Sequence, residues 1–256
     1  MKIATSILNS DNRIESVLNL NKTNTSYIHV DVMDGRFVED IQFNVNEISA
    51  VNRVTKYPMD IHLMVNDPIS YIVKLKDMNI EYITFHLEIR KNKEKVISKI
   101  KEYGYKVGIS IKPDTNLEEI MPYLKNIDLV LVMSVEPGKG GQEFLDKTVD
   151  RVLELKKIID ENNYNIKIEV DGGINDKTIT KLNGVDIVVV GSYIIKSDNY
   201  YSSIEKIIKL VKKDNNAIFS NYDVKVVNRK ILLYKILLGI GLFSFILLVL
   251  LLLSYI

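Results

Sequence analysis

The sequence predicts an α/β fold, a closed (β/α)8 TIM barrel followed by a single C-terminal transmembrane helix. Two observations indicate the barrel: short apolar or β-branched runs alternate with longer amphipathic segments, and eight such runs occur within residues 1–213. This length suits a compact barrel better than the alternative, an open doubly wound sheet. A third observation, an uncharged apolar stretch at the end of the chain, indicates the membrane helix.

The predicted strands are short runs rich in apolar and β-branched residues, bounded by polar or turn-forming residues. In chain order they are Ile3–Leu8, Tyr27–Val32, Met59–Met64, Tyr82–His86, Lys106–Ile111, Leu129–Met133, Ile166–Val170 and Ile187–Val190. No G-x-G-x-x-G turn follows the first strand, which argues against a dinucleotide-binding sheet.

The segments between the strands have the apolar spacing of helices, and several begin with Asp or Pro, as helix starts require. The clearest are Pro68–Met78, Lys91–Tyr103, Asp146–Glu161 and Tyr201–Lys212. Together with the strands they define residues 1–213 as the barrel domain.

The chain after the barrel divides into a linker and a membrane anchor. Residues 214–230 are polar and basic, which indicates a linker, and residues 231–256 are predicted to form the transmembrane helix. From Ile236 to Ile256 no residue is charged, whereas a buried globular helix, the alternative, normally keeps a polar face. Basic residues precede the span, so the positive-inside rule puts the barrel on the cytoplasmic side of a single-pass membrane protein. The segment from Met1 to Arg13 has too short an apolar run for a signal peptide.

The composition excludes several classes of function. The 256 residues are 46% hydrophobic and 26% charged, as in one globular domain of barrel size. A formal charge of +1 leaves no basic excess for binding nucleic acid. Because the chain has no Cys, disulfides, thiolate zinc sites and cysteine nucleophiles are excluded, and any metal must be held by His, Asp or Glu.

Histidines and acids gather at the ends of three predicted strands, where barrels of this type place their catalytic groups. Alternation along a strand puts His29 and Asp31 on one face, so they can point into the barrel mouth together with His62 and Asp171. Two imidazoles and two carboxylates suit one divalent cation such as Zn²⁺, Fe²⁺, Mn²⁺ or Co²⁺. The alternative is that the histidines are satisfied residues of the barrel core. His86, at the end of the fourth strand, is interpreted as a structural or supporting residue and not as a ligand.

Glycine-rich loops follow the last three predicted strands. They are Pro137–Gln142, Gly172–Gly173 and Gly191–Ser192. Loops in these positions of a barrel bind phosphate through backbone N–H groups, which glycine leaves accessible. A single glycine pair fits an ordinary turn equally well, but three at consecutive strand ends indicate a phosphate site.

A series of short motifs follows in order between Ile3 and about Ile195. The motifs are Ser6–Asp11, His29–Gly35 with Phe37–Val38, His62–Val65, Phe85–Glu88, Ile111–Thr115, Val132–Gly138, Gly140–Phe144, Val170–Gly173 and Gly191–Ser192. Together they resemble the ribulose-phosphate 3-epimerase family. The resemblance implies a metal-dependent barrel enzyme of carbohydrate metabolism that inverts C3 of a ketose phosphate. The expected reaction converts D-ribulose 5-phosphate to D-xylulose 5-phosphate in the pentose phosphate pathway.

The resemblance also implies roles for individual residues. Asp31 and Asp171 hold the metal with His29 and His62, and the two Asp also exchange the proton on opposite faces of the sugar. The cation stabilises the ene-diolate formed between the two proton transfers. The implied substrate contacts are Ser6, His62, Gly138, Lys139, Gly140, Gly141, Asp171, Gly172, Gly173, Gly191 and Ser192. The implied apolar lining of the site is Met33, Met64 and Met133.

Several positions depart from the family pattern, and they leave the choice of substrate open. Arg36 stands in place of His, Glu39-Asp40 in place of Pro-Asn, Asn44 in place of Gly and Lys139 in place of an aromatic residue. Lys139 either adds positive charge near the phosphate or points to solvent. One alternative function is therefore 3-epimerisation of a hexulose phosphate such as allulose 6-phosphate. Another is an inactive, membrane-tethered scaffold, against which the metal set and phosphate loops argue. The expected partners are a ketose phosphate and a membrane, and self-association into a homo-oligomer is left open.

Overall fold

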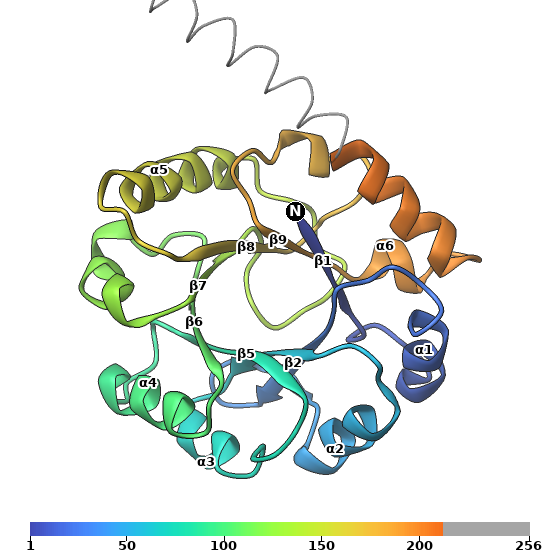
Figure 1. Cartoon of the computed structure of the whole chain (residues 1–256), viewed down its shortest axis with the longest axis horizontal. Coiled ribbons are helices and arrows are strands. Elements are labelled where there is room, and N and C mark those ends of the chain that lie inside the picture. The colour runs from blue at the N-terminus through green and yellow to red at the C-terminus, as the bar shows by residue number, and fades with distance from the viewer. Residues whose placement is uncertain (212–256) are drawn as a thin grey trace, which may run out of the picture. The chain divides into compact units, whose positions relative to one another are not determined.

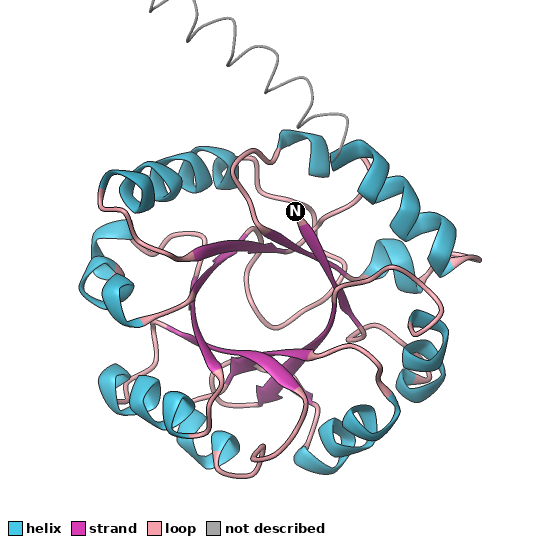
Figure 2. Cartoon of the chain, in the orientation of Figure 1, coloured by secondary structure: helices cyan, strands magenta, loops and turns pink. Residues whose placement is uncertain are grey.

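The computed structural model describes residues 1–211, and these residues form the predicted (β/α)8 barrel (Figure 1). Its eight parallel strands are β1 (Lys2–Ser6), β2 (Tyr27–Asp34), β4 (Met59–Met64), β5 (Ile80–His86), β6 (Lys106–Ile111), β7 (Leu129–Met133), β8 (Lys167–Asp171) and β9 (Ile187–Val190). Each strand pairs with the next in this order, and β1 pairs with both β2 and β9, which closes the sheet. Figure 2 shows the helices arranged around the outside of the strands.

The predicted strands are confirmed, with differences at their ends and one additional strand. β1 ends at Ser6 instead of Leu8, β5 begins at Ile80 instead of Tyr82, and β8 ends at Asp171 instead of Val170. A short β3 (Ile41–Gln42), which was not predicted, pairs antiparallel with the end of β2. This pairing continues the β2 ladder to Asp34, beyond the predicted end at Val32.

The helices around the barrel are fewer and shorter than eight full βα units would give. They are α1 (Arg13–Leu20), α2 (Val45–Val54), α3 (Pro68–Ile72), α4 (Lys93–Glu102), α5 (Lys147–Glu161), α6 (Ser192–Ile195) and residues 200–211. Only short 3₁₀ segments connect β6 to β7, namely η1 (Leu117–Glu119) and η2 (Met121–Asn126), while η3 (Ile179–Lys181) connects β8 to β9.

The predicted helix Pro68–Met78 was too long. In the structure α3 ends at Ile72, and the N–H groups of Lys74 and Leu75 bond to carbonyls three residues back, which is the pattern of a turn. Asp77 then takes a positive φ of 65°, which no α-helix contains.

Asparagine side chains fix the start of the first two helices. Asn12 accepts a hydrogen bond from the backbone N–H of Glu15 at the start of α1. Asn44 forms a capping box with Glu47 at the start of α2, in which each side chain bonds the backbone of the other. Asn44, one of the departures from the family pattern, therefore has a local structural role.

The strands are buried on both faces because helices cover the outside and side chains fill the inside. Residues at the strand starts form part of an apolar cluster, including Tyr27, Tyr82, Leu129 and Ile187. The rings of Tyr27 and Tyr82 pack edge to face, with centroids 5.9 Å apart. These apolar side chains occupy the start of the barrel interior, and the polar interior residues lie further along the strands, toward their C-terminal ends.

Residues Met1–Leu210 form one compact unit. Among the helices within residues 1–211, none combines the length and apolar character needed to cross a membrane. The predicted linker, residues 214–230, and the predicted transmembrane helix, residues 231–256, lie outside the described residues.

Candidate active site

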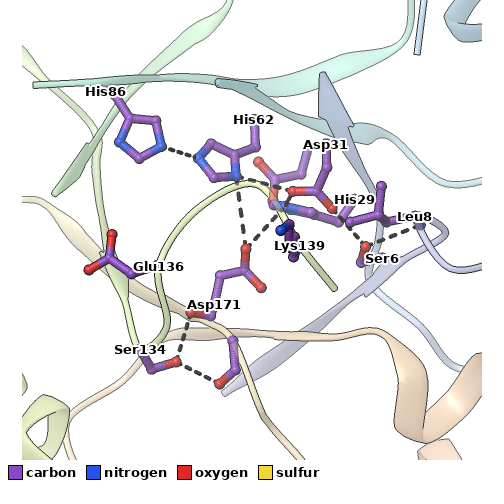
Figure 3. Close-up of polar contacts among 12 residues, drawn as sticks. Ser6, Leu8, His29, Asp31, His62, His86, Ser134, Glu136, Lys139 and Asp171 are labelled. Atoms are coloured by element: carbon purple, nitrogen blue, oxygen red, sulfur yellow. Dashed lines mark hydrogen bonds and ion pairs between the residues drawn. The ribbon is translucent and has the colours of Figure 1, made fainter. Parts of the chain in front are cut away.

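The four predicted metal ligands converge at the C-terminal end of the barrel (Figure 3). His29 and Asp31 come from β2, His62 from β4 and Asp171 from β8. The Oδ1 atom of Asp31 lies 3.2 Å from both His29 Nε2 and His62 Nδ1. The Oδ2 atom of Asp171 lies 3.9 Å and 3.8 Å from the same two nitrogens. All four candidate ligand atoms are within 4.8 Å of one another, so they surround one small volume.

The spacing and the chemistry of these atoms fit a divalent cation. Four ligands placed about 2.0–2.2 Å from a tetrahedral Zn²⁺ lie about 3.3–3.6 Å from one another. The four separations between a histidine nitrogen and an aspartate oxygen, from 3.2 Å to 3.9 Å, need only small adjustments to reach that geometry. Mixed nitrogen and oxygen ligands also suit Fe²⁺, Mn²⁺ and Co²⁺. The cluster can therefore bind one divalent metal, and its ligand set is compatible with several.

Neighbouring side chains orient both ligands of β2. His29 Nδ1 is 2.6 Å from Oδ2 of Asp60, and both side chains are buried. Ser6 Oγ donates a hydrogen bond of 2.8 Å to Oδ2 of Asp31. Metal-binding histidines commonly use their second nitrogen in this way, which fixes the nitrogen that faces the metal.

Electrostatic interactions and burial shift the pKa values of the two cluster carboxylates in opposite directions. Burial raises the pKa of Asp31, but the adjacent His29 and His62 outweigh burial and hold that pKa well below its usual range. Burial and then the charge of Asp31 raise the pKa of Asp171 to about 6. Burial lowers the pKa of His29, but Asp31 and Asp60 outweigh burial and raise that pKa well above its usual value. One carboxylate is thus held ionised, while the other can take up a proton close to neutral pH.

A pair of buried acids lies beside His29, on the side away from Asp31. Asp60, Glu169 and His29 each place one side-chain atom within 4.8 Å of the others. Among the residues that the structure describes, no hydrogen-bond partner faces either carboxylate oxygen of Glu169 or the Oδ1 atom of Asp60. Burial and then the charge of Asp60 raise the pKa of Glu169 well above its usual range, which favours the protonated acid.

A cavity of about 580 Å³ lies at the barrel mouth. It is lined by all the residues predicted to contact the substrate or to form the apolar lining of the site, except the fully buried His62. Its lining includes Ser6, Asp31, Met33, Met64, Met133, Gly138, Lys139, Gly140, Gly141, Asp171, Gly172, Gly173, Gly191 and Ser192. The loop that follows β7, yellow-green in Figure 1, crosses this end of the barrel. Asn9, Thr178 and Tyr193 also line the cavity and were not predicted.

Close backbone contacts hold the glycine-rich loops together. A Cβ atom on Gly173 would lie 2.4 Å from the backbone nitrogen of Phe144, so these two loops touch at a point that only glycine permits. Ser134 Oγ bonds the carbonyl oxygens of Asp171 and Gly172 at 2.7 Å and 2.6 Å. Asn9 Nδ2 donates a hydrogen bond of 2.7 Å to Ser192 Oγ. Short contacts therefore fix the end of β8 and the loop after it to the loop after β7, and the loop after β9 to the loop after β1.

Sequence reasoning did not identify three acidic residues that support the cluster. Asp60 and Glu169 each stand two positions before a predicted ligand, so strand alternation could have placed both inside the barrel. Glu88 contacts His86, whose ring lies against His62 and outside the four-residue cluster. Glu88 stands two positions after His86, so strand alternation could have placed it on the same side as that ring, whereas the contact between His86 and His62 depends on how neighbouring strands are staggered.

Two of the residues that depart from the family pattern, Lys139 and Glu39, form an ion pair with each other. Lys139 Nζ is 4.0 Å from Oε2 of Glu39, and the two side chains are 67% and 92% exposed. Such an exposed ion pair adds little stability. Lys139 lines the cavity as well, so its positive charge lies at the mouth of the site.

A closed (β/α)8 barrel with a buried cluster able to bind a metal at its C-terminal end defines the class of the protein as a barrel enzyme. Solved structures support the fold. The 3-hexulose-6-phosphate synthase of Salmonella typhimurium matches with a TM-score of 0.62 and 19% identity, over 84% of this chain and all of that one. Phosphoribosyl anthranilate isomerase from Thermococcus kodakaraensis matches with a TM-score of 0.57 and 12% identity, over 82% of this chain and 98% of that one. At these identities the likeness concerns the fold alone.

Comparison with known sequences gives the family. The profile of the "Ribulose-phosphate 3 epimerase family" matches residues 2–195. A ribulose-phosphate 3-epimerase of Helicobacter pylori strain J99 is 39% identical over 212 residues, which cover 80% of this chain and 95% of the relative. The enzyme of that name from Bacillus subtilis is 34% identical, over 81% of this chain and 98% of the relative. The chain therefore belongs to the ribulose-phosphate 3-epimerase family, as its motifs predicted. The predicted enzyme of this family is thereby confirmed, and nothing in these matches supports an inactive membrane-tethered scaffold.

Proposed function

We propose that the chain catalyses epimerisation at C3 of a ketose phosphate, with D-ribulose 5-phosphate and D-xylulose 5-phosphate as its substrates. The observation that carries the proposal is the pairing of Asp31 and Asp171. Their carboxylates approach one centre from β2 and β8, and their pKa values are shifted in opposite directions. Inversion of a carbon that carries an acidic proton needs two such groups, one that removes the proton and one that supplies a proton to the other face.

In the proposed mechanism the two Asp exchange roles with the direction of the reaction. In one direction the ionised carboxylate takes the proton from C3, and the protonated one delivers a proton to the opposite face. Ser6, which bonds Oδ2 of Asp31, holds that carboxylate in place. A divalent cation held by His29, Asp31, His62 and Asp171 would supply a positive charge that stabilises the ene-diolate oxygens. The methionines Met33, Met64 and Met133 would exclude water from the reacting carbon.

The phosphate of the substrate is proposed to bind at the side of the cavity that the glycine-rich loops line. The backbone at Gly140, Gly141, Gly173 and Gly191 lines that side, and Ser192 adds a hydroxyl group. Glycine allows the phosphate to approach the backbone N–H groups closely. Lys139 at the cavity mouth would add a positive charge that favours a dianionic substrate.

The test is a turnover assay on the purified full-length chain in detergent, with Mn²⁺ or Zn²⁺ added. Asp31→Asn and Asp171→Asn are each expected to lower kcat by at least about 10³-fold, because each removes one of two required proton carriers. Asp160→Asn, on the exposed surface of α5, is the control and should retain full activity. Normal activity of either cluster variant would exclude exchange between two carboxylates.

The same assay decides between two substrates. The departures at Glu39, Asp40 and Asn44 lie in the segment between β2 and α2, beside the barrel mouth. We propose the pentulose phosphate as substrate, and the ratio of kcat/KM values for it and for allulose 6-phosphate tests this choice. A higher kcat/KM for allulose 6-phosphate would make the chain a hexulose-phosphate epimerase.

We further propose that residues 231–256 anchor the barrel, residues 1–213, to the cytoplasmic face of a membrane through the linker 214–230. The support is the sequence alone: no charged residue occurs from Ile236 to Ile256, and Lys225, Arg229, Lys230 and Lys235 precede that stretch. Carbonate extraction of membranes tests the proposal. The full-length chain should stay in the pellet and residues 1–213 in the supernatant. Full-length chain in the supernatant would overturn it.

A further inference from the structure

A row of hydrogen-bonded side chains leads away from His62, on the side opposite the proposed metal. His62 Nε2 lies 3.0 Å from Nε2 of His86 on the neighbouring strand β5 (Figure 3). The Nδ1 atom of His86 lies in turn 3.1 Å from Oε2 of Glu88. Both imidazoles have no exposed surface, so water does not compete for the contact between the two rings, whereas the Glu88 side chain is 23% exposed.

Glu88 is held as a hydrogen-bond acceptor by other groups. Its Oε1 atom accepts the backbone N–H of Lys112 at 2.8 Å and the hydroxyl of Thr115. These donors come from the segment after β6 and leave Oε2 free to accept from His86. This row of hydrogen bonds from His62 through His86 therefore ends at Glu88, an acceptor that the backbone of the next βα unit holds in place.

The position of each proton follows from this acceptor. Because Glu88 accepts, Nδ1 of His86 carries a hydrogen and donates it. A neutral His86 then has a lone pair on Nε2, and this lone pair faces Nε2 of His62. The hydrogen between the two rings must consequently belong to His62 Nε2. The remaining nitrogen of His62, Nδ1, is left with its lone pair directed at Asp31 and Asp171.

Packing also fixes the orientation of the His86 ring. The ring of Phe37 lies on it with centroids 4.7 Å apart, and the ring of His62 is 5.0 Å away. The backbone N–H of Phe37 bonds Oδ1 of Asp34 at 2.8 Å, which holds the loop after β2 against the ring. The imidazole therefore packs against Phe37 and is held at its two nitrogens by His62 and Glu88, so it cannot turn freely.

We propose that His86 and Glu88 are positioning residues that hold His62 in the tautomer whose Nδ1 lone pair faces the metal site. The inference rests on the proposed role of His62 as a metal ligand. It adds two residues that touch neither the metal nor the substrate but set the affinity for the metal. Residues behind metal-binding histidines have this effect in other proteins.

The experiment measures Zn²⁺ affinity of the full-length chain by competition with a chelator, with no substrate present. His86→Phe keeps an aromatic ring but removes the acceptor, and it is expected to weaken Zn²⁺ binding by about 10–100-fold. Glu88→Gln keeps the side-chain shape and is expected to weaken binding by at least about threefold, because a neutral acceptor is poorer than a charged one. NMR of the Zn²⁺-loaded, ¹⁵N-histidine-labelled chain should show a slowly exchanging His62 Nε2–H in the wild type and fast exchange in His86→Phe.

The matched control is Thr84→Val, on the same strand two residues before His86. Thr84 is buried, and its hydroxyl has no hydrogen-bond partner within residues 1–211. The change therefore removes a polar group beside His62, its register partner on β4, without removing a hydrogen bond between His62, His86 and Glu88. Its Zn²⁺ affinity should equal that of the wild type. If His86→Phe does not fold, as judged by circular dichroism, Glu88→Gln and its NMR spectrum decide.

Unchanged Zn²⁺ affinity in the folded His86→Phe variant, or in Glu88→Gln where it decides, would overturn the inference. An equal loss of Zn²⁺ affinity in Thr84→Val would also overturn the inference, because it would show that any disturbance of the core weakens binding. A wild-type chain that binds neither Zn²⁺ nor Mn²⁺ would refute the proposed function itself, and the positioning role with it. Loss of turnover alone has no bearing on the outcome, since affinity and proton exchange are measured without substrate.

Discussion

The Nδ1 atom of His29 lies 2.6 Å from the Oδ2 atom of Asp60, and both side chains are fully or almost fully buried. This contact directs the other nitrogen of the ring, Nε2, toward Asp31 and Asp171. A charged acceptor behind a ligating histidine also makes it a stronger ligand. Asp60→Asn, which keeps the shape but removes the charge, is therefore expected to weaken Zn²⁺ binding by about 10–100-fold in a chelator competition.

A control for this variant is Asp128→Asn, at the opposite end of the barrel. Asp128 Oδ2 accepts the backbone N–H of Val107 at 2.8 Å, so its replacement should lower the free energy of unfolding without changing Zn²⁺ affinity. Equal Zn²⁺ affinities for Asp60→Asn and the wild type would contradict a role for the His29–Asp60 contact.

Glu169 predicts an unusual dependence of stability on pH. Burial and Asp60 raise the pKa of Glu169 well above its usual value, so the folded chain keeps a proton that the unfolded chain loses as the pH rises above about 4.3. Where the folded state binds more protons, the free energy of unfolding falls with rising pH, by up to about 1.4 kcal/mol per pH unit for one group. Glu169→Gln removes this term. In urea titrations of the metal-free chain, its stability relative to the wild type should increase from pH 5 to pH 8.

The comparison variant for this measurement is Glu94→Gln, an exposed position in the first turn of α4. Its stability relative to the wild type should differ by less than about 0.5 kcal/mol at either pH. A stability difference between Glu169→Gln and the wild type that does not change with pH would mean that Glu169 is ionised in the folded chain.

The strands and the metal cluster could be predicted because each depends on local pattern. Every barrel strand is a short apolar run, and alternation along β2 puts His29 and Asp31 on one face whatever the rest of the chain does. The parallel arrangement then brings the ends of all strands to one opening, which places His62 and Asp171 beside them.

Features that depend on contacts between elements were not predicted. The contacts of His29 with Asp60 and of His62 with His86 depend on the stagger of neighbouring strands, which the sequence does not display. After Ile72 the backbone hydrogen bonds of α3 give way to turns, and Asp77 then takes a positive φ that no sequence rule demands. β3 exists because two residues of the loop happen to pair with the end of β2.

Metal affinity should depend on pH through Asp171. Its pKa is raised to about 6 in the metal-free chain, by burial and then by the charge of Asp31. Below that pH a proton occupies the ligand, and binding of the cation must release it. The apparent association constant for Zn²⁺ should therefore rise by up to about tenfold per pH unit below pH 6 from this group, with a weaker dependence above. Asp171→Asn should bind more weakly at pH 7 and show a smaller slope; an unchanged slope would assign the competing proton to another residue.

Gly173 and Gly104 offer a test of the loop geometry at the proposed phosphate site. Both have positive φ, of 62° and 78°, so alanine at either position strains the backbone by about 1–2 kcal/mol. They differ in their surroundings. A Cβ atom at Gly173 would lie 2.4 Å from the nitrogen of Phe144 and 2.8 Å from its Cα, whereas no atom of residues 1–211 lies within 4 Å of a Cβ atom at Gly104.

Gly173→Ala must therefore push apart the two loops that line the cavity, while Gly104→Ala changes the backbone energy alone. Both variants should lose stability in urea titrations because both strain the backbone, and Gly173→Ala should lose more because its Cβ atom also clashes with Phe144. Only Gly173→Ala should raise KM for the ketose phosphate, by at least about tenfold, since displacing binding groups by about 1 Å is costly. Comparable KM values for the two variants would place the phosphate away from the contact between Gly173 and Phe144, and would move the search for its site to the loop that contains Gly191.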